Sequence, residues 1–138
     1  MGAAAALGMR GLAGALAVVS AGAAAHAEEG DAARGERVFQ RCHACHSVEP
    51  QERAKLHGPS LYRIVGRPAA AIAGFAYSDA MKVRAAAGLV WEAASLDRYI
   101  ADPEAFAPGT PMSEPPLRDE QERADLIAYL ERSGRYEP

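Results

Sequence analysis

The chain has 138 residues, of which 24% are charged, and its formal net charge at neutral pH is −3. This length is close to the usual size of one domain. Its 15 basic and 18 acidic residues lack the basic excess that is typical of proteins that bind nucleic acid, so we expect no nucleic-acid partner.

The N-terminal segment has the pattern of a secretory signal peptide. Arg10 is followed by small, apolar residues that end in an A-x-A cleavage pattern at Ala25 to Ala27. This apolar run is shorter than the about 20 residues that span a bilayer, which disfavours a retained membrane anchor. We therefore predict a signal peptide at residues 1–27 and one periplasmic domain at residues 28–138, without stable membrane insertion. Because Arg10 leaves with the signal peptide, the net charge changes from −3 to −4.

The first predicted helix begins after Asp31 and runs to about Cys42. An aspartate at the N-cap accepts hydrogen bonds from the amides of the first turn. Gly35 and Phe39 are four residues apart and therefore share one face of this helix. Because glycine inside a helix costs about 1 kcal/mol relative to alanine, we expect Gly35 to permit close contact with another helix.

The segment RCHACHSVEP, residues 41–50, holds two cysteines and two histidines within five positions. A disulfide between Cys42 and Cys45 would close too short a loop to stabilise the protein much. A thioredoxin-like site would lie beside a βαβ pattern, which the sequence does not show. A structural zinc ion needs four converging ligands, and so short a segment cannot supply them, with His57 the only other histidine after residue 27.

What remains is the C-x-x-C-H signature of covalent haem c attachment. Cys42 and Cys45 would form the two thioethers. His46, which directly follows the second cysteine, would be the proximal iron ligand. His43 lies in the two-residue spacer, and we expect it to face solvent.

Three further helices are predicted, at about residues 78–87, 95–102 and 119–133. Gly88 follows the first of them, and Pro103 stops the second because proline disfavours helical geometry in the residue before it. Asp119 and Glu122 approximate a capping box at the start of the third, and Gly134 suits its C-terminal end. No segment has the run of β-branched residues that favours a strand, so the predicted fold class is all-α.

Met112 is the candidate for a second iron ligand, on the other side of the haem. It lies in the extended loop Pro108-Gly-Thr-Pro-Met, whereas methionines that fill cores normally lie on periodic elements. Met81 lies on a predicted helix, and we expect it to pack in the core. His57 is too close in sequence to His46 to reach the opposite face of the haem.

Five blocks, in this order along residues 30–130, resemble class I cytochrome c of the mitochondrial and alphaproteobacterial kind. They are Gly35…Phe39…Cys42-x-x-Cys45-His46, then HGPSLYRIVGR, GFAYSDAM, LVW…LDRYIADPEAFAPGTPM and RADLIAYL. The resemblance implies a fold of three to five helices wrapped around one covalently bound haem c.

The resemblance also implies roles for individual residues. His46 and Met112 would be the axial ligands, and the carbonyl of Pro59 would accept a hydrogen bond from the Nδ1–H of His46. Arg67, Tyr77 and Trp91 would bind the haem propionates, and Tyr99 and Thr110 would be polar groups near the methionine. The first and last helices would cross at four positions: Gly35, Phe39, Leu126 and Tyr129.

The sequence departs from the family pattern around the haem edge. Ser113 and Glu114 stand where mitochondrial members have a hydrophobic residue and then a shielding aromatic one. A carboxylate there would lower the reduction potential and admit water. Met81 stands where an asparagine is common. The lysine ring that binds partners is largely absent: Lys55, Lys82 and the arginine Arg41 remain, and Glu104 and Pro111 replace common lysines.

The expected function is that of a soluble periplasmic electron carrier, monomeric and not an enzyme, because iron with histidine and methionine ligands has no site for a substrate. Its donor would be a protein such as a dehydrogenase or bc1-type complex, and its acceptor a terminal oxidase or reductase. With few lysines, we expect partners with less acidic docking surfaces. Two alternatives stay open: a dedicated haem subunit of a periplasmic dehydrogenase, and a ligand-binding or peroxidatic haem protein in which Met112 is labile.

Overall fold

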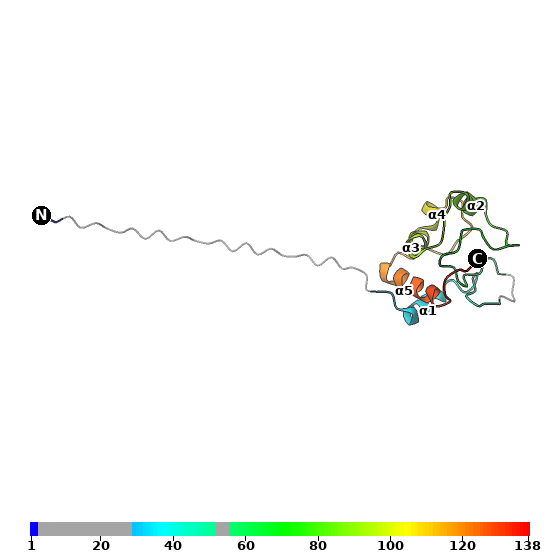
Figure 1. Ribbon diagram of the computed structural model, residues 1–138, viewed down its shortest axis with the longest axis horizontal. Coiled ribbons are helices and arrows are strands. Elements are labelled where there is room, and N and C mark those ends of the chain that lie inside the picture. Colours follow the sequence, from blue (N-terminus) through cyan, green and yellow to red (C-terminus); the bar gives the residue numbers. More distant parts are fainter. Residues whose placement is uncertain (3–28, 52–55) are drawn as a thin grey trace.

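The structure is a computed structural model that describes residues 1–2, 29–51 and 56–138. Most of the predicted signal peptide, its cleavage site and Lys55 lie outside the described residues. The described chain forms α1 (Ala32–Phe39), α2 (Asp79–Ala86), α3 (Ala93–Ala101), α4 (Pro103–Phe106) and α5 (Glu120–Glu131), as Figure 1 shows. Its only extended pairing is an isolated bridge between Pro68 and Val90. The all-α prediction is therefore confirmed.

The two terminal helices begin at the residues that the sequence indicates. The side chain of Asp31 accepts a hydrogen bond from the amide of Arg34 at 2.7 Å, and Asp119 accepts one from the amide of Glu122 at 2.8 Å. These carboxylates satisfy amides that have no partner inside the helix. After α5, Gly134 adopts a φ of 88°, a left-handed conformation that turns the chain away.

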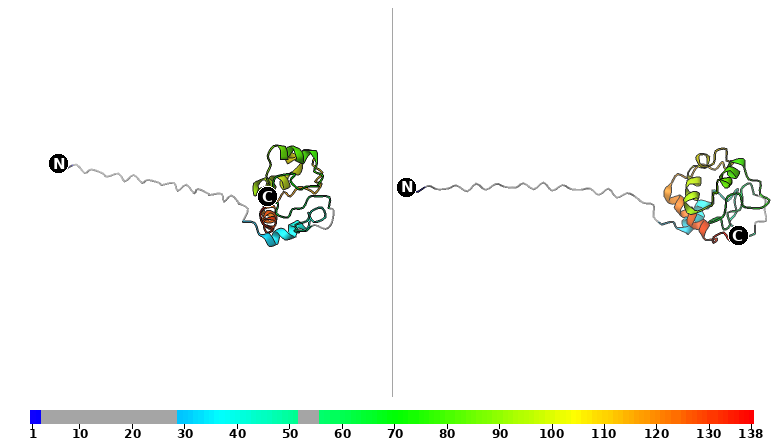
Figure 2. Two further views of the ribbon diagram at one scale, coloured as in Figure 1. Left: turned by 45° about the vertical axis from the view of Figure 1, so that its right-hand side comes forward. Right: turned by 45° about the horizontal axis from the view of Figure 1, so that its top comes forward.

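α1 and α5 cross in direct contact, as both views in Figure 2 show. A Cβ atom at Gly35 would overlap the backbone carbonyl of Asp125, so only glycine permits this approach. Beside the crossing, the rings of Phe39 and Tyr129 lie 5.3 Å apart. The predicted role of Gly35 is confirmed.

The middle helices differ from the prediction in two ways. α3 begins at Ala93 rather than at Ser95. Glu92 is the N-cap, and the hydroxyl of Ser95, the third residue of the helix, accepts a hydrogen bond from the amide of Glu92 at 2.9 Å. α4 was not predicted. Pro103 does end α3, but it also occupies the first turn of α4, where Asp102 caps the amide of Ala105 at 3.0 Å.

The core lies between the α1–α5 pair and the three middle helices. Its buried members come from α1, α2, α3, α5 and the loops that connect them: Phe39, Ile64, Val65, Ala69, Met81, Trp91, Leu96, Leu117, Leu126, Ile127 and Leu130. Met81 is 9% exposed, which confirms that it packs in the core. Trp91, Tyr99 and Phe106 form an aromatic cluster whose ring centroids lie 5.3–6.1 Å apart.

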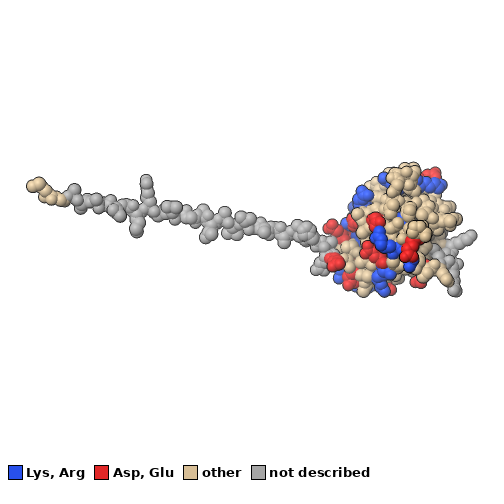
Figure 3. Space-filling view, in the orientation of Figure 1, with Lys and Arg blue, Asp and Glu red and all other residues tan. Residues whose placement is uncertain are grey.

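The surface drawn in Figure 3 carries acidic and basic side chains side by side over the α1 and α5 region. Ion pairs join several charged side chains of the described residues. Arg34 binds Asp125 at 2.7 Å, and Arg41 binds Glu114 at 3.0 Å. None of the helices in the described residues is long and apolar enough to cross a membrane.

Candidate haem site

The C-x-x-C-H segment continues directly from α1 as a series of tight turns. The helix ends at Phe39, three residues before the predicted end, and the amide of Cys42 still donates to the carbonyl of Phe39 at 2.8 Å. The amide of His46 then donates to the carbonyl of Cys42 at 2.9 Å. Both thiols are free rather than joined in a disulfide. His43 is exposed, as predicted.

The imidazole of His46 is held in one orientation. Its Nδ1 lies 2.7 Å from the carbonyl oxygen of Pro59. A carbonyl can only accept a hydrogen bond, so Nδ1 carries the proton and the lone pair lies on Nε2. This tautomer is the form in which histidine binds a metal through Nε2, and a hydrogen bond on the other nitrogen makes the ligand more basic.

Gly58 packs against the face of this ring and was missed by the sequence reasoning. Its amide donates to the carbonyl of Cys45 at 2.8 Å. A Cβ atom at this position would overlap the imidazole of His46. The only signal was its place between His57 and Pro59 in a block that resembles the family, because nothing local reveals a contact across twelve residues.

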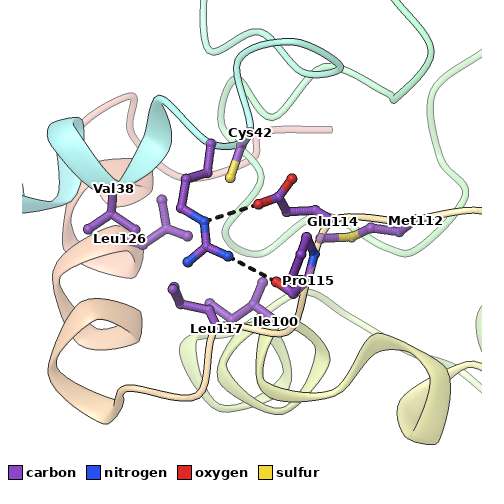
Figure 4. Close-up of a pocket in the computed structure, with 9 residues that line it drawn as sticks. Val38, Cys42, Ile100, Met112, Glu114, Pro115, Leu117 and Leu126 are labelled. Carbon is purple, nitrogen blue, oxygen red and sulfur yellow. Dashed lines mark hydrogen bonds and ion pairs between the residues drawn. The ribbon is translucent and has the colours of Figure 1, made fainter.

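Met112 and Cys42 line the same small hollow, which Figure 4 shows in close-up. The other residues that line it are mostly apolar: Val38, Arg41, Ile100, Glu114, Pro115, Leu117 and Leu126. Burial, together with the nearby carboxylate of Glu114, raises the pKa of the Cys42 thiol to about 11. The first cysteine of the motif and the candidate methionine thus meet in one largely apolar site, although 70 residues separate them.

The loop that carries Met112 is tied to α3. The hydroxyl groups of Tyr99 and Thr110 lie 2.9 Å apart and share a hydrogen bond. The amide of Met112 donates to Thr110 Oγ1 at 3.4 Å, a long and weak bond. Burial raises the pKa of Tyr99, so its hydroxyl stays protonated and available as a donor. Tyr99 and Thr110 therefore together connect α3 to the loop that carries Met112.

Arg67 has the one orphaned donor among the buried side chains described. It is 5% exposed, and its terminal nitrogens donate to the carbonyls of Ser60 at 2.9 Å and Tyr62 at 3.1 Å. Its Nε atom is buried and has no partner within the described chain. A buried donor without a partner costs about 1–3 kcal/mol, and a carboxylate such as a haem propionate would satisfy it.

The other two residues assigned to the propionates lie close to Arg67. The amide of Trp91 donates to the carbonyl of Arg67 at 2.9 Å. Tyr77 lies within electrostatic range of the Arg67 guanidinium. Its hydroxyl accepts a hydrogen bond from the amide of Ile72 at 3.3 Å. The residues that are present therefore fit an anionic edge of a haem.

Comparison with known proteins identifies the family of the chain. A family model described as cytochrome c matches residues 32–133. Cytochrome c2 of Rhodomicrobium vannielii is 45% identical over 101 residues, which cover 73% of this chain and 78% of that protein. Cytochrome c2 of Blastochloris viridis is 45% identical over 112 residues, which cover 81% and 85%. The solved structure of cytochrome c2 from Rhodospirillum centenum has a TM-score of 0.69 and 39% identity, and the match covers 75% of this chain and 98% of that one. The chain therefore belongs to the cytochrome c family, carries one haem c attached through Cys42 and Cys45, and is an electron carrier rather than an enzyme.

Proposed function

We propose that the protein shuttles single electrons between periplasmic redox partners through a haem whose axial ligands are His46 and Met112. The observation that carries this proposal is the bond of 2.7 Å between His46 Nδ1 and the carbonyl of Pro59, because it presents the Nε2 lone pair of a fixed imidazole. When bound, the haem supplies a one-electron couple between the ferric and ferrous states.

The residues of the chain would keep that couple closed to other chemistry. With His46 and the thioether of Met112 as its ligands, the iron would have no open position for a substrate. Methionine ligation also favours a raised reduction potential. Tyr99 and Thr110 support this role of Met112, since they hold its loop against α3.

Arg67 would bind and neutralise a propionate. Its guanidinium is already fixed by two carbonyls, so little freedom is lost when the orphaned Nε finds a partner. Tyr77 and Trp91 would add hydrogen bonds to the same edge. These three side chains would thereby fix how the haem sits in the protein and exclude water from its buried edge.

The periplasmic location rests on the sequence pattern of residues 1–27. If the signal peptide is removed after Ala27, the protein purified from its host begins at Glu28. Mass spectrometry of the protein from both the periplasmic and the membrane fractions tests this directly. A mass that includes residues 1–27 would contradict the cleavage and favour a retained anchor.

Optical spectra of the matured protein test the ligand pair. We expect a low-spin spectrum with the methionine–iron charge-transfer band in the oxidised state, and only slow binding of carbon monoxide in the reduced state. Met112→Leu should abolish the band and admit carbon monoxide rapidly. Met81→Leu, a volume-conserving change in the core, is the matched control and should leave both properties unchanged. High-spin iron in the unaltered protein would overturn the proposal and favour a ligand-binding function.

A further inference from the structure

Arg41 joins the haem-attachment segment to the loop that follows Met112. Its Nε donates to Glu114 Oε1 at 3.0 Å, and one terminal nitrogen donates to the carbonyl of Pro115 at 3.1 Å. Figure 4 shows both contacts at the rim of the hollow that Met112 and Cys42 line. One side chain thus spans two segments that are 73 residues apart in sequence.

The contacts of Arg41 lie between two other attachment points of the loop. Ahead of Met112, the loop is tied through Thr110 to Tyr99 at 2.9 Å. Beyond it, the amide of Leu117 donates to the carbonyl of Ile100 at 2.9 Å. Arg41 holds the stretch between these two ties, and it holds it to the segment that carries the cysteines rather than to α3.

The chemistry of the pair suits arginine in particular. A guanidinium presents several donors in a rigid fork, so one group can bind a carboxylate and a backbone carbonyl at the same time. Glu114 also gains from a cation, because its carboxylate borders a mostly apolar hollow beside the half-buried Cys42 and is partly shielded from water. Arg41 offsets the loss of water around that carboxylate.

We propose that Arg41 is a positioning residue that keeps the Met112 loop closed over the haem, with Glu114 and Pro115 as its two attachment points. This rests on the proposed ligation by His46 and Met112. Both side chains of the ion pair are about two-fifths exposed, at 39% and 38%. Partly exposed pairs contribute modestly, and the two ties to α3 remain, so breaking the pair should increase opening of the loop about two- to fivefold.

The rate at which the reduced, haem-loaded protein binds carbon monoxide measures this opening, because the gas can bind only when Met112 has left the iron. Glu114→Gln should raise the rate about two- to fivefold and weaken the methionine–iron charge-transfer band at elevated temperature. Arg41→Gln should do the same. Arg41→Lys keeps the charge but cannot make both contacts, so its rate should lie between those of the unaltered protein and Arg41→Gln.

Two controls separate positioning from a general loss of stability. Glu137→Gln removes the ion pair of 2.9 Å with Arg63. Arg63 is as exposed as Arg41 but contacts the C-terminal segment, so the carbon monoxide binding rate of Glu137→Gln should not change. The double variant Arg41→Gln/Glu114→Gln should be no faster than Arg41→Gln alone, because Arg41→Gln already removes the contacts with both Glu114 and Pro115.

The outcomes distinguish this proposal from the one on which it rests. If the unaltered protein binds carbon monoxide slowly and Glu114→Gln and Arg41→Gln bind it at the same slow rate, Arg41 does not position the loop, while the His46/Met112 pair stands. Additive effects in the double variant would also overturn the proposal. If the unaltered protein binds carbon monoxide rapidly, both proposals fail.

Discussion

Gly35 of α1 lies so close to the backbone carbonyl of Asp125 in α5 that a Cβ atom on the glycine would overlap it. The two helices pack against each other at this point, and Phe39 and Tyr129 pack beside it. Because α1 leads directly into Cys42, the position of the haem-attachment segment depends on this crossing.

Gly35→Ala should therefore destabilise the protein although alanine is the better helix former. The overlap is with backbone, so the helices must separate, and we expect the free energy of unfolding to fall by about 3 kcal/mol. Denaturant unfolding of the haem-loaded protein measures this. Glu36→Ala is the matched control on the exposed face of the same helix and should change the free energy of unfolding by less than about 0.5 kcal/mol. A stability equal to that of the unaltered protein would contradict the close approach.

Asp125 gives the same crossing a dependence on pH. Hydrogen bonds from Arg34 at 2.7 and 2.8 Å, and one from the amide of Asp31 at 2.8 Å, hold the pKa of the Asp125 carboxyl well below its usual range. Since the folded pKa is the lower one, the stabilisation is fully present above the unfolded value of about 4 and is lost as the pH falls below it.

Asp125→Asn should lower the free energy of unfolding at pH 7 by about 2–3 kcal/mol, because the side chain is 5% exposed and its charge is fully hydrogen-bonded. It should also flatten the loss of stability below about pH 4. Thermal unfolding between pH 2 and pH 7 measures both effects. Asp79→Asn, at a side chain that is 97% exposed, should change neither. An acid limb of the same slope in Asp125→Asn would show that another carboxylate causes it.

Substitutions at Gly58 and Pro59 should affect the imidazole of His46 in opposite ways. Gly58→Ala places a methyl group against the imidazole of His46, so the ring must turn and its bond to Pro59 must lengthen or break. We expect the reduction potential to vary more with pH and the spectrum of the haem-loaded protein to be perturbed. Pro59→Ala keeps the backbone carbonyl that accepts the bond, and its spectrum should resemble that of the unaltered protein. If Pro59→Ala is the more disruptive change, the proline ring matters more than its carbonyl.

The sequence predicted those features that depend on short spacing. The caps at Asp31 and Asp119, the packing of Met81 and the outward position of His43 all follow from local rules of capping and periodicity. α4 was missed because Pro103 was interpreted only as the end of a helix, although the same residue is suited to a first turn. The contact between Gly58 and His46 and the bridge from Arg41 to Glu114 join distant segments, so no local pattern announces them.

Substitution of Arg67 should change the reduction potential of the protein and not only its stability. Arg67→Lys keeps a positive charge but loses the planar fork that reaches the carbonyls of Ser60 and Tyr62. Arg67→Gln also removes the charge, which favours the ferric state because a nearby cation stabilises the reduced one. We expect the potential to fall in Arg67→Gln by some tens of millivolts, where roughly 59 mV corresponds to a tenfold change in equilibrium. Redox titration of both variants measures it, and an unchanged potential in Arg67→Gln would place Arg67 away from the haem.

The pairing of Arg41 with Glu114 also bears on how the protein meets its partners. A cation that is already bound to a carboxylate attracts an acidic partner weakly, so we expect electron transfer with a strongly acidic redox protein to depend little on salt. Glu114→Gln would release the charge of Arg41 toward solvent, which should raise the association rate at low ionic strength and steepen its decrease with added salt. Stopped-flow reduction at several salt concentrations tests this. Glu137→Gln is the control, since it also removes one carboxylate and releases an arginine, Arg63, from an ion pair of 2.9 Å, but at the C-terminal segment. A steep salt dependence in the unaltered protein would show that its arginines already form an effective basic docking surface.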